Sequence, residues 1–401
     1  MLFRDAFHDG FGTWPLAYIS TGGADYGEIQ AVAEAVGDGD DGAYYDAWMA
    51  AGERLEQEAQ VCLSAGSRAG AEAQYLKAAA FYATSYHPIF GEPVDPRIVR
   101  AFGKQKAALE AALRLRSNGF RPLSIPFEGQ TLPGYFIPAE GRAAEVRPLL
   151  ILTNGYDGTI TDQYFASAVA ASRRGYHCLL FDGPGQGEAL ILQGLRLRPD
   201  WEVVVKAVVD VAITLPGVDP ARIVLSGWSL GGYLAPRAAS GEHRLAACIA
   251  DPGLWDMGGS FRAVAVAMGA TLTQAENLGE LNDALVGKLE QLLLTNRRLR
   301  WSIVQRGFWV HGVDNLRDYL RSAELFTMKG RAAEIRCPTL LTAAEGDPLA
   351  QSAASFFEEL RCPKTFLQFT AAEGAGGHCE MMNRSLLNRR VLDWLDQLFA
   401  D

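Results

Sequence analysis

The stretch that decides the fold is Arg222-Ile-Val-Leu-Ser-Gly-Trp-Ser-Leu-Gly-Gly-Tyr233. Its first part, Ile223 to Ser226, is mainly apolar and β-branched, which predicts a short buried strand. The residues from Tyr233 to Ala239 then predict a helix. Between the two lies Gly227-Trp-Ser-Leu-Gly231, and a G-x-S-x-G pattern between a strand and a helix is the setting that exposes a nucleophilic serine.

Simple sterics explain the glycines of this pattern. Ser229 has to lie on a strained turn so that its hydroxyl projects above the sheet, and side chains at Gly227 or Gly231 would crowd that turn. The amides at the start of the next helix would face any negative charge that forms at Ser229. A chance match is the competing explanation because the chain has 42 glycines, but the flanking strand and helix favour a nucleophile.

Composition and charge narrow the function classes. The 401 residues allow a large core plus one addition, and a hydrophobic share of 49% is typical of a globular enzyme. The net charge is −10 and no basic stripe is present, which argues against nucleic acid as a partner. Six scattered cysteines indicate a reducing compartment. A charged N-terminus and the absence of a long apolar run predict a cytoplasmic protein with no membrane partner.

Residues 1–118 are predicted to form a helical cap domain. Apolar residues recur at helical spacing, and no alternation typical of strands is present. The predicted helices are Tyr44 to Ser64, Ala69 to Tyr86, and Ile98 to Arg116, the last ended by Asn118-Gly119.

Residues 119–401 are predicted to form an α/β catalytic domain. Short apolar runs alternate with helical stretches, which implies a mostly parallel central sheet with helices on both faces. The predicted strands are Leu123 to Phe127, Thr131 to Ile137, Leu149 to Leu152, His177 to Phe181, Ile223 to Leu225, Ala247 to Ala250, Thr339 to Leu341 and Thr365 to Phe369. One helical excursion, about residues 255–330, interrupts the alternation, and we expect it to form a lid over the carboxyl edge of the sheet.

A serine nucleophile needs a base, and the base needs an orienting carboxylate. With this turn the chain order is serine, acid, histidine. His378 follows the last predicted strand in a glycine-rich loop and is the favoured base, and His311 is the runner-up. Asp347 follows the preceding strand and is the favoured acid, although an Asp before Pro is also a common helix cap. Glu345 and Asp251 are the alternative acids.

An oxyanion formed at the substrate needs two backbone N–H donors. One is the residue after the nucleophile, Leu230, and the other should follow an early strand. We favour Tyr156, with Asp157 as the alternative. The glycines of Asp182-Gly-Pro-Gly-Gln-Gly187 do not have nucleotide-binding spacing, so this string is interpreted as a structural turn that borders the site. No metal-ligand spacing is present, and we expect no cofactor and no metal.

With these residues placed, the chain resembles the α/β-hydrolase superfamily. More narrowly, it resembles the branch with an N-terminal helical cap that includes 2,6-dihydroxypseudooxynicotine hydrolase and the fungal pigment hydrolases that shorten polyketides. The resemblance covers roughly residues 120–401 by motif and the cap by its helical character. The matching strings are Asn154-Gly-Tyr-Asp-Gly158, Phe181-Asp-Gly-Pro-Gly-Gln-Gly187, Gly227-Trp-Ser-Leu-Gly231, Gly346-Asp347 and Gly374-Ala-Gly-Gly-His378.

This resemblance implies a small-molecule carbonyl substrate, and a homodimer is expected from it alone. Members of the branch cleave carbon–carbon bonds next to a ketone, and relatives cleave esters. We therefore expect a serine hydrolase that cleaves such a bond in a bulky aromatic or polyketide-like compound. A carboxylesterase or lactonase is the alternative, as is an acyltransferase or cyclase with the same triad.

Four aromatic residues and one aspartate are the expected substrate contacts. Trp48, Tyr82 and Tyr86 in the cap, with Trp228 and Asp157 beside the catalytic residues, are predicted to contact the substrate. The competing interpretation of the three cap residues is that they form the cap's own core.

Overall fold

The computed structural model describes residues 1–116 and 119–400. In this part of the chain, eight strands form one sheet in the order β1-β2-β4-β3-β5-β6-β7-β8. β1 and β2 are antiparallel to their neighbours, and all other pairs are parallel. All eight predicted strands are confirmed. Their bounds are β1 Arg121–Phe127, β2 Gln130–Ile137, β3 Arg147–Thr153, β4 His177–Phe181, β5 Val218–Trp228, β6 Ala247–Asp251, β7 Thr339–Ala344 and β8 Lys364–Phe369.

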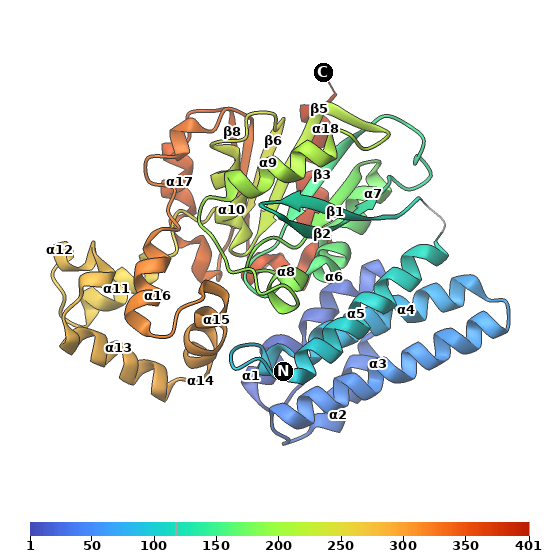
Figure 1. The fold of residues 1–401 in the computed structure, drawn as a ribbon, viewed down its shortest axis with the longest axis horizontal. Coiled ribbons are helices and arrows are strands. Elements are labelled where there is room, and N and C mark those ends of the chain that lie inside the picture. The colour runs from blue at the N-terminus through green and yellow to red at the C-terminus, as the bar shows by residue number, and fades with distance from the viewer. Residues whose placement is uncertain (117–118, 401) are drawn as a thin grey trace.

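Helices cover both faces of this sheet, as Figure 1 shows. β3, β4, β6 and the second half of β5 are mostly buried and apolar, which requires cover on both sides. One face carries α9 (Trp201–Ala212) and α10 (Gly231–Ala239), and the other carries α7 (Val169–Arg174) and α18 (Arg384–Leu398). The smaller helices are α6 (Ile160–Gln163), α8 (Gly187–Ile191) and α17 (Ala353–Glu359). The predicted α/β-hydrolase architecture is therefore confirmed.

In the described residues 1–116, five α-helices precede the sheet. The three predicted ones are present as α3 (Asp41–Ser64), α4 (Arg68–Ser85) and α5 (Pro96–Leu115). Asn118, where the last was expected to end, lies outside the described residues. The sequence reasoning missed three earlier elements, α1 (Ala6–Gly12), the 3₁₀ segment η1 (Trp14–Thr21) and α2 (Tyr26–Val36). The apolar core of these helices is continuous with that of the sheet. The division into a cap and a catalytic domain stays a proposal.

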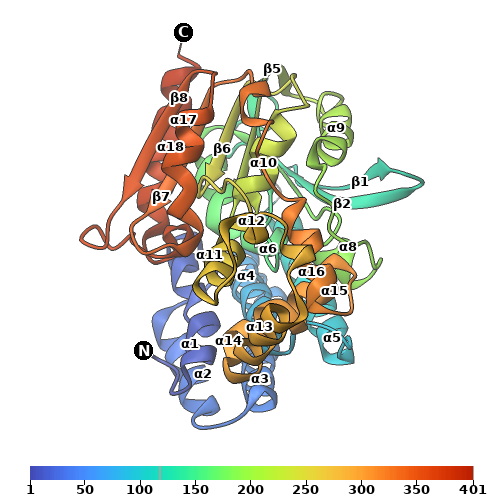
Figure 2. The same ribbon diagram turned by 90° about the vertical axis from the view of Figure 1, so that its left-hand side faces the viewer.

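The chain between β6 and β7, residues 252–338, is helical, and we call it the insert. Its helices are α11 (Gly259–Ala267), α12 (Leu272–Ala275), α13 (Asp283–Thr295), α14 (Arg297–Arg300), α15 (Phe308–His311) and α16 (Leu316–Glu324), with a π-helical turn at Trp301–Gly307. It has a small apolar core of its own, centred on residues such as Leu285, Leu289 and Leu320. Figure 2 shows the insert and the N-terminal helices beyond the same edge of the sheet, at one end of its strands. None of the described helices is both long and apolar enough to cross a bilayer.

Candidate active site

Ser229 lies on the sharp turn between β5 and α10. Its φ angle is +58°, a left-handed conformation that non-glycine residues rarely adopt. A Cβ atom at Gly227 would lie 2.0 Å from the carbonyl oxygen of Gly231, and one at Gly231 would lie 2.8 Å from that of Thr153. Both glycines are therefore required by close backbone approach, as the sequence predicted. The amide of Ser229 donates to the carbonyl oxygen of Asp251 at 2.7 Å, which fixes the turn against β6.

The structure brings Ser229, His378 and Asp347 together. His378 Nε2 lies 3.0 Å from Ser229 Oγ, and His378 Nδ1 lies 2.8 Å from Asp347 Oδ2. The three come from the turn after β5, the loop after β8 and the turn after β7, which all lie at the carboxyl edge of the parallel strands. The imidazole thus has one nitrogen at the hydroxyl and the other at the carboxylate.

Asp347 performs two structural tasks with its two oxygens. Oδ2 faces His378, while Oδ1 accepts a hydrogen bond of 2.9 Å from the amide of Leu349 and caps the helical turn that follows. Burial by itself would raise the pKa of Asp347, but hydrogen bonds from His378 and from the amides of Leu349 and Cys379 bring that pKa below its ordinary value. Capping and pairing with the histidine are therefore compatible.

The alternative residues are engaged elsewhere. The carboxylate of Glu345 accepts a hydrogen bond of 2.8 Å from the amide of Ala371. Asp251 is buried in an ion pair with Arg384, at 2.6 Å. His311 lies in the insert and contacts Tyr156 instead of Ser229. The geometry thus favours Asp347 and His378 over the residues kept as alternatives.

The loop after β3 runs directly beside Ser229. A Cβ atom at Gly155 would lie 2.7 Å from Ser229 Cβ and 3.1 Å from the amide nitrogen of Leu230, so only glycine fits there. The amide of Leu230 has no acceptor among the described residues, and the same holds for the amides of Tyr156 and Asp157. All three are available to a ligand, and the choice of Leu230 and Tyr156 as oxyanion donors stays a prediction.

Three side chains brace this loop. Gln186 Nε2 donates to the carbonyl oxygen of Asn154 at 2.7 Å, and Trp228 Nε1 donates to Asn154 Oδ1 at 3.0 Å. Asp182 Oδ1 accepts from the amide of Ile160 at 3.0 Å and from Asn154 Nδ2 at 3.3 Å. The Asp182–Gly187 string therefore holds the loop beside the serine, which agrees with its interpretation as a structural turn at the border of the site.

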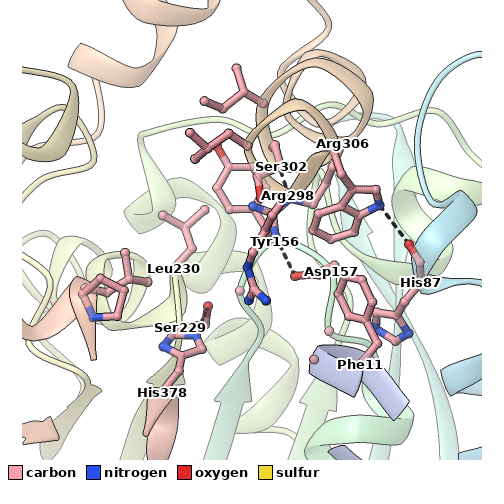
Figure 3. Close-up of a pocket in the computed structure, with 18 of the residues that line it drawn as sticks. Phe11, His87, Tyr156, Asp157, Ser229, Leu230, Arg298, Ser302, Arg306 and His378 are labelled. Atoms are coloured by element: carbon pink, nitrogen blue, oxygen red, sulfur yellow. Dashed lines mark hydrogen bonds and ion pairs between the residues drawn. The ribbon is translucent and has the colours of Figure 1, made fainter. Parts of the chain in front are cut away.

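A cavity of about 600 Å³ lies above Ser229. Its lining is mostly apolar and comes from the sheet edge, the N-terminal helices and the insert. Figure 3 shows Ser229 and His378 at the floor, with Arg298, Ser302 and Arg306 descending from the insert. The aromatic side chains that line it are Phe11, Trp14, Tyr18, Tyr156, Trp228, Phe261, Trp301 and Tyr319.

Comparison with known proteins decides the family. A model described as "Alpha/beta hydrolase family" matches residues 150–387. The chain belongs to the alpha/beta hydrolase family. Hydrolase LUC6 from a Fusarium species is 31% identical over 394 residues, which cover 94% of this chain and 93% of that protein. The 20-hydroxy-prefusarin hydrolase FUS2 from Gibberella moniliformis is 31% identical over 402 residues, with the same coverage of 94% and 93%.

Solved structures of similar fold extend over both helical regions of this hydrolase. The crystal structure of 2,6-dihydroxy-pseudo-oxynicotine hydrolase matches with a TM-score of 0.74 at 22% identity and covers 96% of each chain. Wild-type AbyA5 matches with a TM-score of 0.67 at 18% identity and covers 97% of this chain and 93% of the other. At these identities the likeness concerns the fold alone.

Two predicted substrate contacts of the hydrolase line the cavity, and three do not. Trp228 and Asp157 are lining residues. Trp48, Tyr82 and Tyr86 are absent from the described lining and are buried within the N-terminal helices. Trp48 packs edge-on against Phe81, Tyr82 Oη donates to Glu56 at 2.7 Å, and Tyr86 Oη donates to Gln105 at 2.8 Å. The predicted substrate contact of Trp48, Tyr82 and Tyr86 is therefore wrong, and these residues belong to the core of the N-terminal helices.

Trp14 occupies the position that the sequence analysis gave to those aromatics. Its ring centroid lies 5.8 Å from that of Trp228 and 6.4 Å from that of His378. It lies in η1, a 3₁₀ segment whose sequence has no clear helical periodicity, so its place at the cavity was not predictable from the sequence.

We expect matched substitutions to separate these two roles. Trp14→Leu should raise KM for an aromatic substrate several-fold because it removes a ring at the cavity wall. Trp48→Leu should lower the free energy of unfolding by about 2–3 kcal/mol and leave KM unchanged, because it empties part of a packed core. Steady-state kinetics and urea unfolding of both variants check this. A larger change in KM for Trp48→Leu than for Trp14→Leu would contradict the assignment.

A buried polar network joins the loop after β3 to the insert. Tyr156 Oη hydrogen-bonds His311 Nε2 and lies 3.3 Å from Tyr319 Oη. His311 Nδ1 lies 2.6 Å from Ser322 Oγ. Burial, with a smaller contribution from the Arg306 guanidinium, lowers the pKa of His311 to about 3. The imidazole is therefore neutral in the native state and fastens the insert to the loop beside Ser229.

This lowered pKa predicts a loss of stability in mild acid. The unfolded chain takes up a proton at an ordinary histidine pKa of about 6.5, whereas the folded His311 does not, so its contribution is full above that pH and is lost as pH falls. Between pH 7.5 and 5.5 the wild type should lose about 1.4 kcal/mol more than His311→Gln. Urea unfolding of both proteins at the two pH values measures the difference. Equal losses would show that His311 does not titrate in this way.

Among residues 1–116 and 119–400, one group has the composition of a metal site. Asp347, His378 and Cys379 offer ligand atoms that all lie within 4.8 Å of one another. The first two already bond each other, and burial raises the pKa of the Cys379 thiol well above its ordinary value. Because a metal binds the thiolate, this group fits a hydrogen-bonded pair better than a metal. All six cysteines lie in the described residues and are free.

Proposed function

We propose that this hydrolase cleaves a carbonyl compound by nucleophilic catalysis with Ser229, His378 and Asp347. The observation that carries the proposal is the ordered pair of hydrogen bonds, 3.0 Å from Ser229 Oγ to His378 Nε2 and 2.8 Å from His378 Nδ1 to Asp347 Oδ2. They lie at the floor of a cavity large enough for a bulky organic substrate. The family membership supports the same conclusion.

Each residue has a role that its position allows. Ser229 Oγ attacks the carbonyl carbon while His378 Nε2 accepts the hydroxyl proton. Asp347 stays ionised because its pKa is lowered, holds Nδ1–H of the imidazole and stabilises the positive charge that forms. The amides of Leu230 and Tyr156 donate to the oxyanion. Because the braces on the loop fix the Tyr156 amide beforehand, little reorganisation is needed during the reaction.

The second half of the reaction releases the products. His378 returns its proton to the leaving group, which is a carbanion if a carbon–carbon bond breaks and an alkoxide if an ester breaks. Water, activated by the same imidazole, then attacks the acyl-serine and frees Ser229. The net change is addition of one water across the cleaved bond.

A carbon–carbon bond next to a ketone is the proposed target, in a bulky aromatic or polyketide-like compound. The motif resemblance to the capped branch supports this choice, as does a relative at 31% identity that is named for its action on 20-hydroxy-prefusarin. Eight aromatic side chains in the cavity lining would suit an extended unsaturated substrate. Ester or lactone hydrolysis would use the same residues and is the alternative outcome of the test.

A small substrate panel tests the proposal. An aryl ester, a β-diketone and a phenolic aryl ketone are each incubated with the wild type, and the products are separated by chromatography and weighed by mass spectrometry. Cleavage of the ketones to an acid and a shortened ketone or arene is expected. Turnover of the ester alone would assign a carboxylesterase, and coupling or ring closure without water uptake would assign an acyltransferase or cyclase.

A further inference from the structure

Arg298 is a cationic side chain in the wall of the catalytic cavity. It belongs to α14 of the insert and is one of the lining residues. Figure 3 shows its side chain reaching from the insert into the cavity, with the guanidinium on the side of Ser229. A Cβ atom at Gly10 would lie 2.9 Å from Arg298 Nη1, so the guanidinium lies directly against α1. It is therefore placed where the insert and the N-terminal helices meet above the catalytic floor.

The neighbouring arginines have carboxylate partners, whereas Arg298 does not. Arg297 pairs with Asp5 at 2.9 Å and with Asp41 at 2.5 Å. Arg306 pairs with Asp157 at 3.1 Å, and its guanidinium lies 4.5 Å from the centre of the Tyr156 ring. No residue in the described ranges 1–116 and 119–400 makes a hydrogen bond or an ion pair with the Arg298 side chain. Arg298 thus brings a positive charge into the cavity that the chain itself does not neutralise.

The acidic residues of the cavity cannot serve as its partner because each is already held. Asp157 is paired with Arg306. Asp162 accepts hydrogen bonds from Tyr18 Oη at 3.0 Å and from the amide of Thr159 at 2.8 Å. Asp347, which is not a lining residue, faces His378. The missing counter-charge must therefore come from a ligand or from solvent.

We propose that Arg298 binds an anionic oxygen pair on the substrate, either a carboxylate or the enolate of an acidic β-dicarbonyl group. This inference rests on the proposed function, because it names the kind of carbonyl compound that reaches Ser229. A guanidinium presents two parallel N–H donors to such a planar, delocalised anion, and the exposed side chain of Arg298 leaves these donors open to a ligand. Arg298 would orient the substrate with its acidic end toward the insert and its reacting carbonyl toward Ser229.

Binding of an anion by Arg298 differs from general attraction to a basic surface. The hydrolase carries a net charge of −10, so its overall field repels anions and the preference must arise locally. Substrate binding would also join the insert to the floor of the cavity through one molecule. An anionic ligand should therefore be selected at one residue, and the remaining arginines of α14 should contribute little.

Binding of paired probes tests the proposal without requiring turnover. The affinities of 4-phenylbutyrate and of neutral 4-phenylbutanamide are measured by isothermal titration calorimetry on the wild type and on Ser229→Ala. A second pair, 5-phenylcyclohexane-1,3-dione as its enolate and the corresponding neutral enol methyl ether, distinguishes the two sources of the anion. We expect the anionic member of at least one pair to bind about tenfold more tightly than the neutral one.

The matched variants are Arg298→Met and Arg300→Met, which each remove one positive charge from α14. Arg298 lines the cavity, and Arg300 does not. Arg298→Met should bring the anion preference to within about twofold, Arg298→Lys should keep part of it, and Arg300→Met should leave it unchanged. Equal binding of anionic and neutral probes to the wild type would overturn the proposal, as would a preference that survives Arg298→Met. Failure of the proposed function would appear separately, as absence of turnover with probe selectivity intact.

Discussion

Ser229→Ala is expected to lower kcat by about 10³-fold or more while the fold stays intact. The hydroxyl is the only group of Ser229 that this change removes, and the backbone remains held by the hydrogen bond from its amide to the Asp251 carbonyl oxygen, at 2.7 Å. His378 keeps its bond to Asp347, so the loss should report on nucleophilic attack alone. Steady-state kinetics on the best substrate of the panel give the value, with circular dichroism as the check on folding.

The matched control is Ser226→Ala, the same change three residues earlier on β5. Ser226 lies opposite Leu152 and Ile249 in the sheet and does not reach the cavity lining. Its replacement should alter kcat by less than about twofold. If Ser229→Ala retained most of the wild-type activity, the covalent mechanism would be excluded, and His378 would have to activate water directly.

Arg384→Met is expected to lower the free energy of unfolding by about 3–5 kcal/mol. Arg384 and Asp251 are both nearly inaccessible, with side-chain exposures of 5% and 4%, and their charges meet at 2.6 Å. Asp251 Oδ1 also accepts a hydrogen bond from the hydroxyl of Thr342 at 2.9 Å, but one neutral donor does not compensate a buried carboxylate. Because the backbone carbonyl oxygen of Asp251 also holds the amide of Ser229, activity should fall along with stability.

Two further variants separate the buried pair from charge removal in general. Arg54→Met removes an exposed arginine from an i,i+4 pair with Glu58 on α3 and should cost less than about 1 kcal/mol. Asp251→Asn added to Arg384→Met should recover part of the lost stability because it neutralises the carboxylate that has lost its arginine. Urea unfolding followed by tryptophan fluorescence measures all three. Similar losses for Arg384→Met and Arg54→Met would contradict the assignment of a structural ion pair.

The sheet and the position of Ser229 were predictable because their signals are local. A short apolar run followed by glycine, serine and glycine specifies a strand and a tight turn within one stretch of chain, and steric contacts at Gly227 and Gly231 bear this out. Asp347 and His378 could be predicted for a different reason, because the chain order of the catalytic residues and the ends of the strands restrict where the acid and the base can lie. The structure places His378 against Ser229 and Asp347 against His378.

The cavity wall was not predictable in the same way. Trp14, Arg298 and Ser229 line the same cavity although they are far apart in the chain. No local sequence pattern predicts that such distant residues share a cavity. The aromatics of α3 and α4 illustrate the opposite error. Trp48 in α3 and Tyr82 in α4 each lie on a buried face of their helix. Helical spacing of apolar residues predicts such a face, but it is the same whether the face packs against other helices or lines a cavity.

Covalent catalysis by Ser229 is tested most directly by intact-mass spectrometry of the enzyme, quenched during turnover of the panel substrate that it cleaves fastest, compared with Ser229→Ala. We expect a wild-type species heavier by the mass of the substrate's acyl fragment, mapped by peptide digestion to Ser229, and no such species in the variant. Turnover without any acyl-enzyme under rapid quench, or an adduct mapped to another residue, would contradict it.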